Sequence, residues 1–416
     1  MRVQYFKQFF SGPASVGTQQ PRELVFKLAQ RGHAVDVIAG DSNAYDERDE
    51  PPETQRFPGG GLVRVRRLRS PKGMRRSLTA RLSTYATFAL RAGASALTLA
   101  RPDVVIGSIQ PLFTGLAALA SARLARAPFV LEIRDLWPDA LQAKGAITAL
   151  QATPLHAMAY LLYHGADRIV SLTPGIKREL EKKGIPSAKI DVLPNGFDPR
   201  LFHVDPTTIA QTRAHYGWGN TFVALYTGTH TEVTAIDVIV RAAAALRQRP
   251  DIRIDLFGQG QTKANAQALA TTLGLSNLHF HDPVPKTQIP AIIAAADVCL
   301  MTLFESPLIH IYFENKFMDY MGSGKAILAA MGGEQAELIT RHETGRVVAA
   351  FDHHGLANLI REGADDPDAL KAYGARGAQL VQDHLLLDTI LSHYVDVIEA
   401  TAANGVHHVA TWEPFA

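Results

Sequence analysis

Short apolar runs alternate along the chain with longer segments in which apolar residues recur every three or four positions. The runs have the length and composition of buried strands, and the longer segments predict amphipathic helices. Strands that alternate with helices favour a parallel, doubly wound α/β sheet. Strands are predicted at residues 3–9, 34–39, 63–68, 103–109, 128–133, 168–173, 190–193, 222–228, 252–257, 278–281, 298–304, 326–330 and 346–351.

This alternation is interrupted once, near the middle of the chain. Residues 194–202, PNGFDPRLF, are rich in turn formers, and residues 204–220 are polar with only loose periodicity. The strand and helix pattern then starts again. We therefore predict an N-terminal domain over residues 1–200, a C-terminal domain over 201–385, and a helix and tail over 386–416 that return toward the N-terminal domain.

Composition excludes several classes of protein. The 416 residues carry a net charge of +2, which gives no bulk affinity for nucleic acid. A single cysteine, Cys299, leaves no intramolecular disulfide, and its place in an apolar run favours a core thiol in a reducing compartment. No signal-like apolar core and no apolar run of about 18 residues occur. We expect a cytoplasmic protein without a membrane span.

The charge is nevertheless uneven. Between Arg56 and Arg101 the chain has many arginines and no acidic residue. This stretch is either a solvated face or a surface for anionic lipid headgroups or a lipid-linked diphosphate. The helix predicted after it has apolar residues at Leu82, Tyr85 and Leu90, which fit a core contact, a membrane contact or both.

Candidate chemistry is densest around residues 305–337, where a polar loop and a short helix separate two predicted strands. Glu314, Asn315, Lys316 and Asp319 lie at or near the predicted start of this helix, at residues 313–321. The carboxyl edge of a parallel sheet is where open α/β folds bind ligands. A helix N-terminus with a lysine beside it suits an anion, and a carboxylate accepts hydroxyl hydrogens. The pattern therefore suits a phosphorylated sugar.

A second charged cluster, Glu132, Arg134, Asp135 and Trp137, follows the strand predicted at 128–133. It indicates either a functional edge or a solvated ion pair, and the tryptophan either stacks on a sugar or packs in the core.

Other motifs are lacking. The first loop has no GxGxxG or GxxxxGK[ST] pattern, and no HxxxH or CxxC spacing occurs, so we expect no dinucleotide fold, P-loop or metal site.

Five motifs, in order, give the chain a family resemblance. It resembles the retaining GT-B glycosyltransferases of the large family 4 type, and EIRDLWPDAL points to the bacterial branch that is similar to fucosamine and N-acetylhexosamine transferases. The resemblance implies two Rossmann-like domains that face a central cleft, with the nucleotide-sugar donor held by the second domain and the acceptor by the first. It also implies that no metal or other cofactor is needed. The motifs are PNGFD, YTGTH, FGQG, AADV and NKFMDYMGSGKAI.

Site residues follow from this resemblance position by position. Asp135, Lys316 and Glu314 are the expected catalytic residues, and Glu132, Arg134 and Trp137 are expected to bind the acceptor. One position departs from the family: its usual pair of glutamates would match Asp319 and position 311, which is Ile311. The donor-binding residues implied are Gly17, Gly228, Thr229, His230, Gly258, Pro285, Asn315 and Asp319.

The function implied is transfer of a sugar, with retention of configuration, from a UDP-linked N-acetylamino sugar to a glycan or lipid-linked acceptor. Peripheral contact with an anionic membrane is one of the two interpretations of the basic stretch. Two alternatives remain open. A nucleotide-sugar epimerase of the same fold would use acids such as Asp135 and Glu132. A non-enzymatic protein would only close on a sugar nucleotide.

Overall fold

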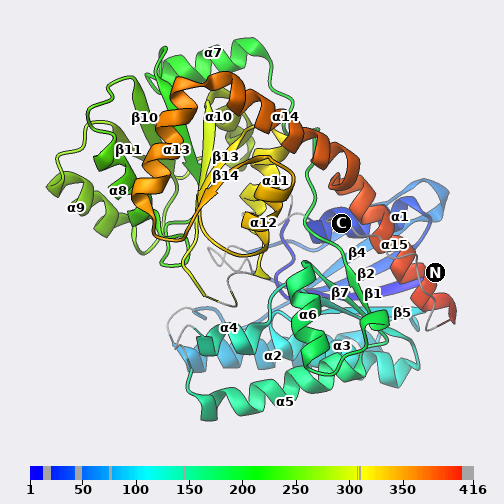
Figure 1. Cartoon of the computed structure of the whole chain (residues 1–416). Coiled ribbons are helices and arrows are strands. Elements are labelled where there is room, and N and C mark those ends of the chain that lie inside the picture. The colour runs from blue at the N-terminus through cyan, green and yellow to red at the C-terminus, as the bar shows by residue number, and fades with distance from the viewer. Residues whose placement is uncertain are drawn as a thin grey trace. The chain divides into compact units, whose positions relative to one another are not determined.

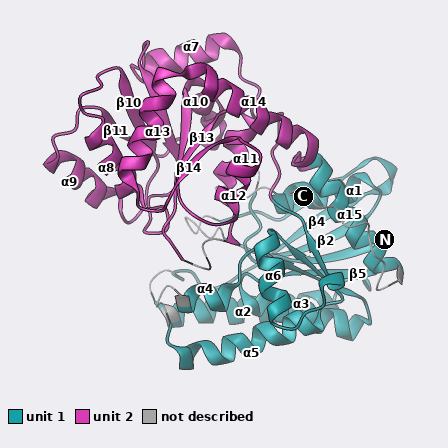
Figure 2. Ribbon diagram, viewed as in Figure 1, with its two compact units in different colours: residues 1–194, 388–413 teal, residues 195–387, 414–416 magenta. Residues whose placement is uncertain are grey.

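The computed structural model of this chain describes residues 1–12, 20–42, 49–74, 77–143, 147–306, 308 and 311–404. Gly17, part of the basic stretch (residues 75–76) and the predicted tail beyond 404 lie outside the described residues. The chain divides into two compact units (Figure 2). Unit 1 is Met1–Pro194 with Asp388–Glu413, and unit 2 is Asn195–Leu387 with Pro414–Ala416.

Unit 1 has a sheet of order β3-β4-β2-β1-β5-β6-β7-β8 in its described residues. Every neighbouring pair is parallel except β3 and β4, which are antiparallel. The parallel strands are apolar because helices cover the sheet on both faces. The strands are β1 Arg2–Phe6, β2 Ala34–Gly40, β3 Glu53–Arg56, β4 Leu62–Leu68, β5 Val104–Ser108, β6 Phe129–Ile133, β7 Arg168–Ser171 and β8 Ile190–Val192.

Several helices of unit 1 begin with side-chain caps. The Ser77 side chain caps one helix, and Thr148 forms a capping box with Gln151 at another. The last helix of the chain is tied to the first by ion pairs of Lys27 with Asp388 and Arg31 with Asp396. The helices are α1 Gln20–Gln30, α2 Leu78–Leu97, α3 Leu112–Ala125, α4 Trp137–Ala143, α5 Ala149–Gly165, α6 Pro174–Lys182 and α15 Leu387–Asn404.

Unit 2 repeats this architecture with a sheet of order β11-β10-β9-β12-β13-β14, parallel throughout its described strands. Its central strands are fully buried between helix layers (Figure 1). The strands are β9 Phe222–Thr227, β10 Ile252–Phe257, β11 Leu278–His281, β12 Val298–Thr302, β13 Ile327–Ala330 and β14 Gly345–Val348. The helices are α7 Pro206–His215, α8 Ile236–Ala245, α9 Lys263–Thr272, α10 Ile289–Ala295, α11 Asn315–Gly322, α12 Glu334–Arg341, α13 His353–Asp365 and α14 Pro367–His384.

The predicted α/β architecture with two parallel sheets is confirmed. Each apolar run that predicted a strand contains one. One strand, β3, was not predicted, because its sequence ETQR is polar and forms a strand only by pairing with β4 at an edge of the sheet. The helix predicted from residue 313 begins at Asn315, because Glu314 has extended backbone angles (φ −76°, ψ 137°). No helix among the described residues has both the length and the hydropathy needed to cross a bilayer.

Candidate functional site

The loops after β9 and β10 in unit 2 approach each other so closely that only glycine fits. Gly228 (φ 145°) and Gly258 (φ 151°) both have positive φ. A Cβ on Gly258 would lie 1.8 Å from the carbonyl oxygen of Gly228. The same loop edge meets α11, since a Cβ on Gly228 would lie 3.0 Å from Nζ of Lys316. Two strand ends and one helix start therefore form a single polar edge.

Lys316, in the first turn of α11, is held in place by three contacts. Its Nζ donates to the Tyr226 hydroxyl at 2.8 Å, lies 4.0 Å from the centre of that ring and is 3.2 Å from Oε2 of Glu314. Burial disfavours the charged form of Lys316, but the Glu314 carboxylate and Tyr226 outweigh it, so the pKa is raised. The lysine is thus a fixed, nearly buried cation.

A second pair of contacts joins β9 to α11. The Tyr320 hydroxyl, fully buried, accepts a hydrogen bond from the backbone N–H of Thr227 at 2.8 Å. The side chain of Glu314, the residue that precedes α11, makes no capping hydrogen bond, and no other described side chain is recorded as a cap there. The first N–H groups and the positive dipole end of α11 are therefore available to an anion next to Lys316.

Asp319 lies one turn after Lys316 on α11. Burial raises the pKa of its carboxyl to about 6, although the Lys286 ammonium lowers it. A carboxyl with this pKa is poised to change charge just below neutral pH. Its ionised form gains most from a ligand that donates hydroxyl hydrogens to it.

His230, in the loop after β9, is fully buried, and neither ring nitrogen has a hydrogen-bond partner among the described residues. Burial, with the positive charges of Lys263 and Lys316, lowers its pKa to about 4, so the ring is neutral. Its ring lies against the loop after β10: its Nε2 would lie 3.2 Å from a Cβ on Gly258. A buried neutral imidazole without partners is unusual, and it marks this loop as a place for a polar ligand group.

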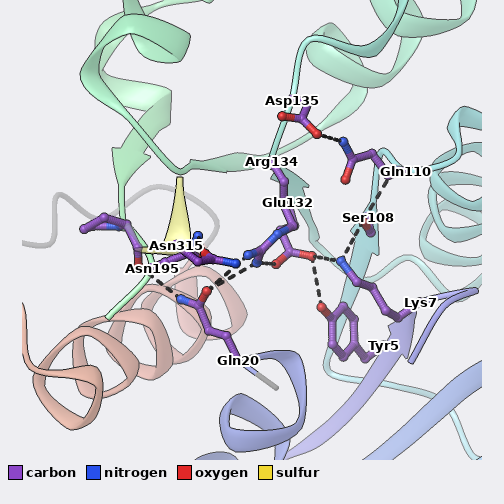
Figure 3. Close-up of polar contacts among 11 residues, drawn as sticks. Tyr5, Lys7, Gln20, Ser108, Gln110, Glu132, Arg134, Asp135, Asn195 and Asn315 are labelled. Carbon is purple, nitrogen blue, oxygen red and sulfur yellow. Dashed lines mark hydrogen bonds and ion pairs between the residues drawn. The ribbon is translucent and has the colours of Figure 1, made fainter. Parts of the chain in front are cut away.

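The other predicted donor residues of unit 2 are placed as follows. Thr229 is exposed, and its carbonyl accepts from the Tyr226 hydroxyl at 2.8 Å. Asn315 is exposed and accepts from the Asn195 side-chain amide at 2.6 Å (Figure 3). Pro285 precedes the short helical turn Lys286–Gln288, which supplies the cation nearest Asp319.

A buried charge cluster lies at the carboxyl edge of the unit 1 sheet, around Glu132 at the end of β6 (Figure 3). Its Oε2 accepts from Lys7 Nζ at 2.7 Å and from the Tyr5 hydroxyl at 3.0 Å. Arg134 Nη1 lies 3.2 Å from the other oxygen, Oε1. Burial raises the pKa of Glu132, but Lys7 and Arg134 outweigh it and bring it to about 2. The carboxylate is therefore ionised and shared between two cations.

The same cluster extends to the adjoining strands. Lys7 also donates to Ser108 Oγ at 3.0 Å, at the end of β5. Arg134 donates to Gln20 Oε1 at 3.3 and 3.4 Å, and the Gln20 amide donates to the Pro194 carbonyl at 3.1 Å. Glu132 therefore holds Arg134 and Lys7 in place, and its predicted contact with an acceptor stays a prediction.

Asp135 and Trp137 have different surroundings. The Gln110 side-chain amide donates to Oδ2 of Asp135, and the aspartate is only half-buried. The Trp137 ring contacts Tyr85 edge to face, with centroids 6.5 Å apart. Tyr85 also contacts Phe9 and Phe113, so Trp137 belongs to an aromatic cluster. The aromatic cluster buries one part of the Trp137 side chain, and the remaining part is accessible to a ligand.

Five side chains at these edges were not predicted from the sequence. Tyr226 was hidden inside an apolar strand, and nothing in its local pattern reveals the lysine packed on its ring. Lys7 follows a strand, which was a usable signal, but its ion pair with Glu132 joins residues 125 positions apart. The unpredicted residues are Lys7, Gln20, Ser108, Gln110 and Tyr226.

Family models match both units. Residues 17–196 match the glycosyl transferase 4-like domain, and residues 221–366 match the glycosyl transferases group 1 family. The two matches together cover most of the chain, one for each unit. The chain belongs to the GT-B glycosyltransferases. The recognition of this family from sequence motifs is confirmed, whereas the narrower branch and the retaining stereochemistry stay predictions.

Curated relatives point in the same direction. The chain is 28% identical over 208 residues to the GDP-mannose-dependent alpha-(1-6)-phosphatidylinositol monomannoside mannosyltransferase of Mycolicibacterium smegmatis, a match that covers 48% of this chain and 53% of that relative. It is 25% identical to the putative colanic acid biosynthesis glycosyl transferase WcaI of Escherichia coli, over 71% of this chain and 70% of the relative. The chain thus spans about half of the mycobacterial relative that it matches.

Solved structures confirm the two-domain fold. Sucrose-phosphate synthase from Thermosynechococcus elongatus has a TM-score of 0.75 at 18% identity, covering 97% of this chain and 99% of that one. Anabaena HepE, solved in complex with UDP-glucose, has a TM-score of 0.71 at 16% identity, covering 96% and 100%.

The Glu132 cluster predicts a large stability effect. Glu132→Gln leaves Lys7 buried without a full counter-charge, so we expect unit 1 to lose about 3–5 kcal/mol of unfolding free energy. Urea unfolding followed by fluorescence measures this. Since the folded pKa of Glu132 is lowered, its contribution is full above about pH 4.5 and is lost as the pH falls through 2. Glu179→Gln, in the exposed pair with Lys182, serves as control and should cost about 1 kcal/mol or less. Equal losses in the two variants would contradict the proposed role of the cluster.

Proposed function

We propose that this protein transfers a sugar from a nucleoside diphosphate sugar to a hydroxyl group of a glycan or lipid-linked acceptor, with retention of configuration. The donor proposed is a UDP-linked N-acetylamino sugar, bound by unit 2. The observation that carries the proposal is the fixed Lys316 cation, beside the uncapped N-terminus of α11 and the glycine ends of β9 and β10.

This edge is suited to a departing diphosphate. In glycosyl transfer, positive charge grows on the sugar ring while negative charge grows on the leaving group, so cationic groups that are already in place lower the barrier. Lys316 is already protonated and oriented by Tyr226, so little reorganisation is needed when the charge develops. We propose that Lys316 and the α11 N-terminus neutralise the diphosphate, and that no metal is required.

Asp319 is proposed to bind the nucleotide ribose. It lies one turn along α11 from Lys316, a spacing that suits groups meeting the ribose and phosphate parts of one nucleotide. Its raised pKa means that hydroxyl donors from the ribose would stabilise the ionised form and lower the pKa on binding. Glu314, which holds Lys316 in the free protein, then competes with the diphosphate for the same ammonium group.

Unit 1 is proposed to hold the acceptor. Asp135, oriented by Gln110, is the candidate to position or deprotonate the acceptor hydroxyl, since it is half-buried and bound by a neutral donor. Arg134, fixed by Glu132 and Gln20, offers a second cation at this edge. A lipid-linked diphosphate acceptor carries the negative charge that such a cation would attract.

The relatives and structural neighbours differ in the nucleotide that their descriptions name. One relative is described as GDP-mannose-dependent, whereas a structural neighbour was solved with UDP-glucose. We retain UDP from the motif resemblance. A cytoplasmic location, with contact to the inner face of the membrane, completes the proposal.

Ligand-induced thermal stabilisation tests the donor class. A ligand that binds only the folded state raises the unfolding midpoint by mass action, by about 2.7 kcal/mol at a hundredfold excess over Kd. We expect UDP and UDP-N-acetylhexosamines to raise the midpoint more than GDP, ADP or TDP and their sugars. A larger shift with GDP sugars would replace the proposed nucleotide, and no shift with any of them would count against a donor site in unit 2.

Lys316→Ala tests the diphosphate contact. Loss of one transition-state contact typically costs about 3 kcal/mol, so we expect kcat, measured well below the thermal midpoint of the variant, to fall about a hundredfold or more. Lys371→Ala, which removes an exposed lysine paired with Asp368, is the matched control and should keep full turnover. Unchanged kcat in the Lys316 variant would remove this residue from the mechanism.

Asp319 predicts a pH dependence of donor binding. The nucleotide-sugar diphosphate has no ionisation near neutral pH, so the carboxyl alone should set the profile. Because its folded pKa is about 6, affinity for the donor should rise about tenfold as pH increases through that value. Titration calorimetry of wild type and Asp319→Asn between acidic and neutral pH measures this. The variant should bind weakly with a flat profile, and a wild-type profile that is also flat would exclude the ribose contact.

A further inference from the structure

Three helices of unit 1 form one layer that contains no acidic residue. Figure 1 shows α2, α3 and α5 side by side on one face of the sheet, and α3 packs against both of the others. No aspartate or glutamate occurs within Leu78–Leu97, Leu112–Ala125 or Ala149–Gly165. An outer helix layer of a protein in water is normally rich in charges of both signs. The composition of this face therefore needs another explanation.

The same layer exposes most of the large apolar side chains that the described part of the chain leaves in solvent. Six of the ten lie on these three helices: Leu90, Leu97, Leu124, Leu150, Tyr160 and Leu161. Leu150 is 84% exposed and Leu90 is 77% exposed. Clustering of this kind marks an interaction surface, whereas apolar residues scattered singly do not.

On α5 the exposed residues share one side of the helix. Leu150, Pro154, Ala157 and Leu161 are spaced four, three and four residues apart, which is the spacing of one helical face. The opposite side is already used for packing, because Leu162 fits against Gly115 of α3, where a Cβ would come within 2.9 Å. The outward side of α5 is thus exposed among the described residues.

The sequence left two roles open for the apolar residues of α2, and the structure separates them. Tyr85 is 8% exposed and packs in the aromatic cluster with Phe9 and Phe113, so it belongs to the core. Leu90 faces solvent on the same helix. The outer side of α2 thus exposes large apolar side chains, whereas its inner side packs within unit 1.

The charged groups around this face are basic. Arg91, Arg101, Arg123 and Arg126 are all exposed. Arg123 donates to the Gly165 carbonyl at the end of α5, which holds its guanidinium beside the apolar residues.

The nearest acids in sequence are already engaged elsewhere. Asp103 accepts from the backbone N–H of Arg2, Asp167 accepts from that of Phe129, and Asp139 pairs with Lys183.

We propose that the outer face of α2, α3 and α5 docks onto an anionic lipid bilayer. The leucines would enter the boundary between headgroups and acyl chains while the arginines bind lipid phosphates. A second copy of the chain fits less well, since a symmetric contact would place arginines against arginines without a carboxylate between them. The inference rests on the membrane contact within the proposed function, and it names the surface that makes the contact.

Co-sedimentation of the full chain with vesicles tests this surface. Wild-type protein should bind vesicles of phosphatidylcholine with about a third phosphatidylglycerol, bind pure phosphatidylcholine weakly, and dissociate in high salt. Leu150→Gln with Leu161→Gln should lower the partition coefficient about tenfold or more, because both side chains leave the apolar boundary. Arg91→Glu with Arg126→Glu should lower it on anionic vesicles only.

Matched variants in unit 2 serve as controls. Leu201→Gln with Leu273→Gln changes exposed leucines, and Arg241→Glu with Arg247→Glu changes exposed arginines. Both should bind vesicles like wild type. Equal losses in these controls, full binding by the unit 1 variants, or no binding of wild type would each overturn the proposal. A dimer in sedimentation that Leu150→Gln with Leu161→Gln dissociates would assign the face to a second copy.

A parallel readout separates this inference from the proposed function. Nucleotide-sugar stabilisation should be the same in wild type and in the unit 1 surface variants, because none of the changed residues lies at either sheet edge. Stabilisation without vesicle binding would refute the docking surface and leave the transferase standing. Vesicle binding without stabilisation by any nucleotide sugar would count against the proposed transferase and leave the docking surface standing.

Discussion

A charge placed at the end of a buried parallel strand must find a partner, and both units of this protein are arranged around that constraint. In unit 1 the Glu132 carboxylate serves two cations and a tyrosine hydroxyl that arrive from β1 and from its own strand. In unit 2 Lys316 is matched by Glu314 and packed on Tyr226. Once such charges are paired, they are also fixed in direction. The ion pairs offset the cost of burying these charges. They also fix the directions of the charged side chains before a ligand binds.

The two edges differ in how their charges are satisfied. Both carboxylate oxygens of Glu132 already accept hydrogen bonds from neighbouring side chains. Its role is therefore to hold those side chains in position. Among the described residues, Lys316 has one anionic partner, the partly buried Glu314 just before α11, and a ligand anion could replace it. Asp319 is paired with no nearby cation strongly enough to keep its pKa low. Binding of the donor would therefore give Lys316 an additional anionic partner and give the Asp319 carboxylate hydrogen-bond donors, both of which the free protein lacks in its described residues.

Much of the fold could be predicted from the sequence because buried parallel strands consist of continuous runs of apolar residues. The edge strand β3 could not, since a polar strand gains its stability from a neighbour rather than from its own composition. Within the candidate site, Lys316 and Asp319 could be predicted to lie together because they are close in sequence on one helix. Lys7 and Gln110 could not be predicted as part of it. Their contacts with Glu132 and Asp135 join the ends of different strands, which are far apart in the sequence. Local pattern identifies the residues of one loop, whereas the partners across a sheet edge depend on strand order.

The contact between Gly228 and Gly258 has a consequence for how this enzyme family can diversify. Two backbones that meet without any Cβ between them present only peptide groups to a ligand, and no substitution can place a new side chain there without separating the strands. Peptide groups bind phosphates, which every nucleotide sugar shares. In the proposed donor site, selection among donors would therefore come from side chains at the margins of this contact, such as Lys286. The part that all nucleotide sugars share would then meet peptide groups, and the part that differs would meet side chains that can be substituted.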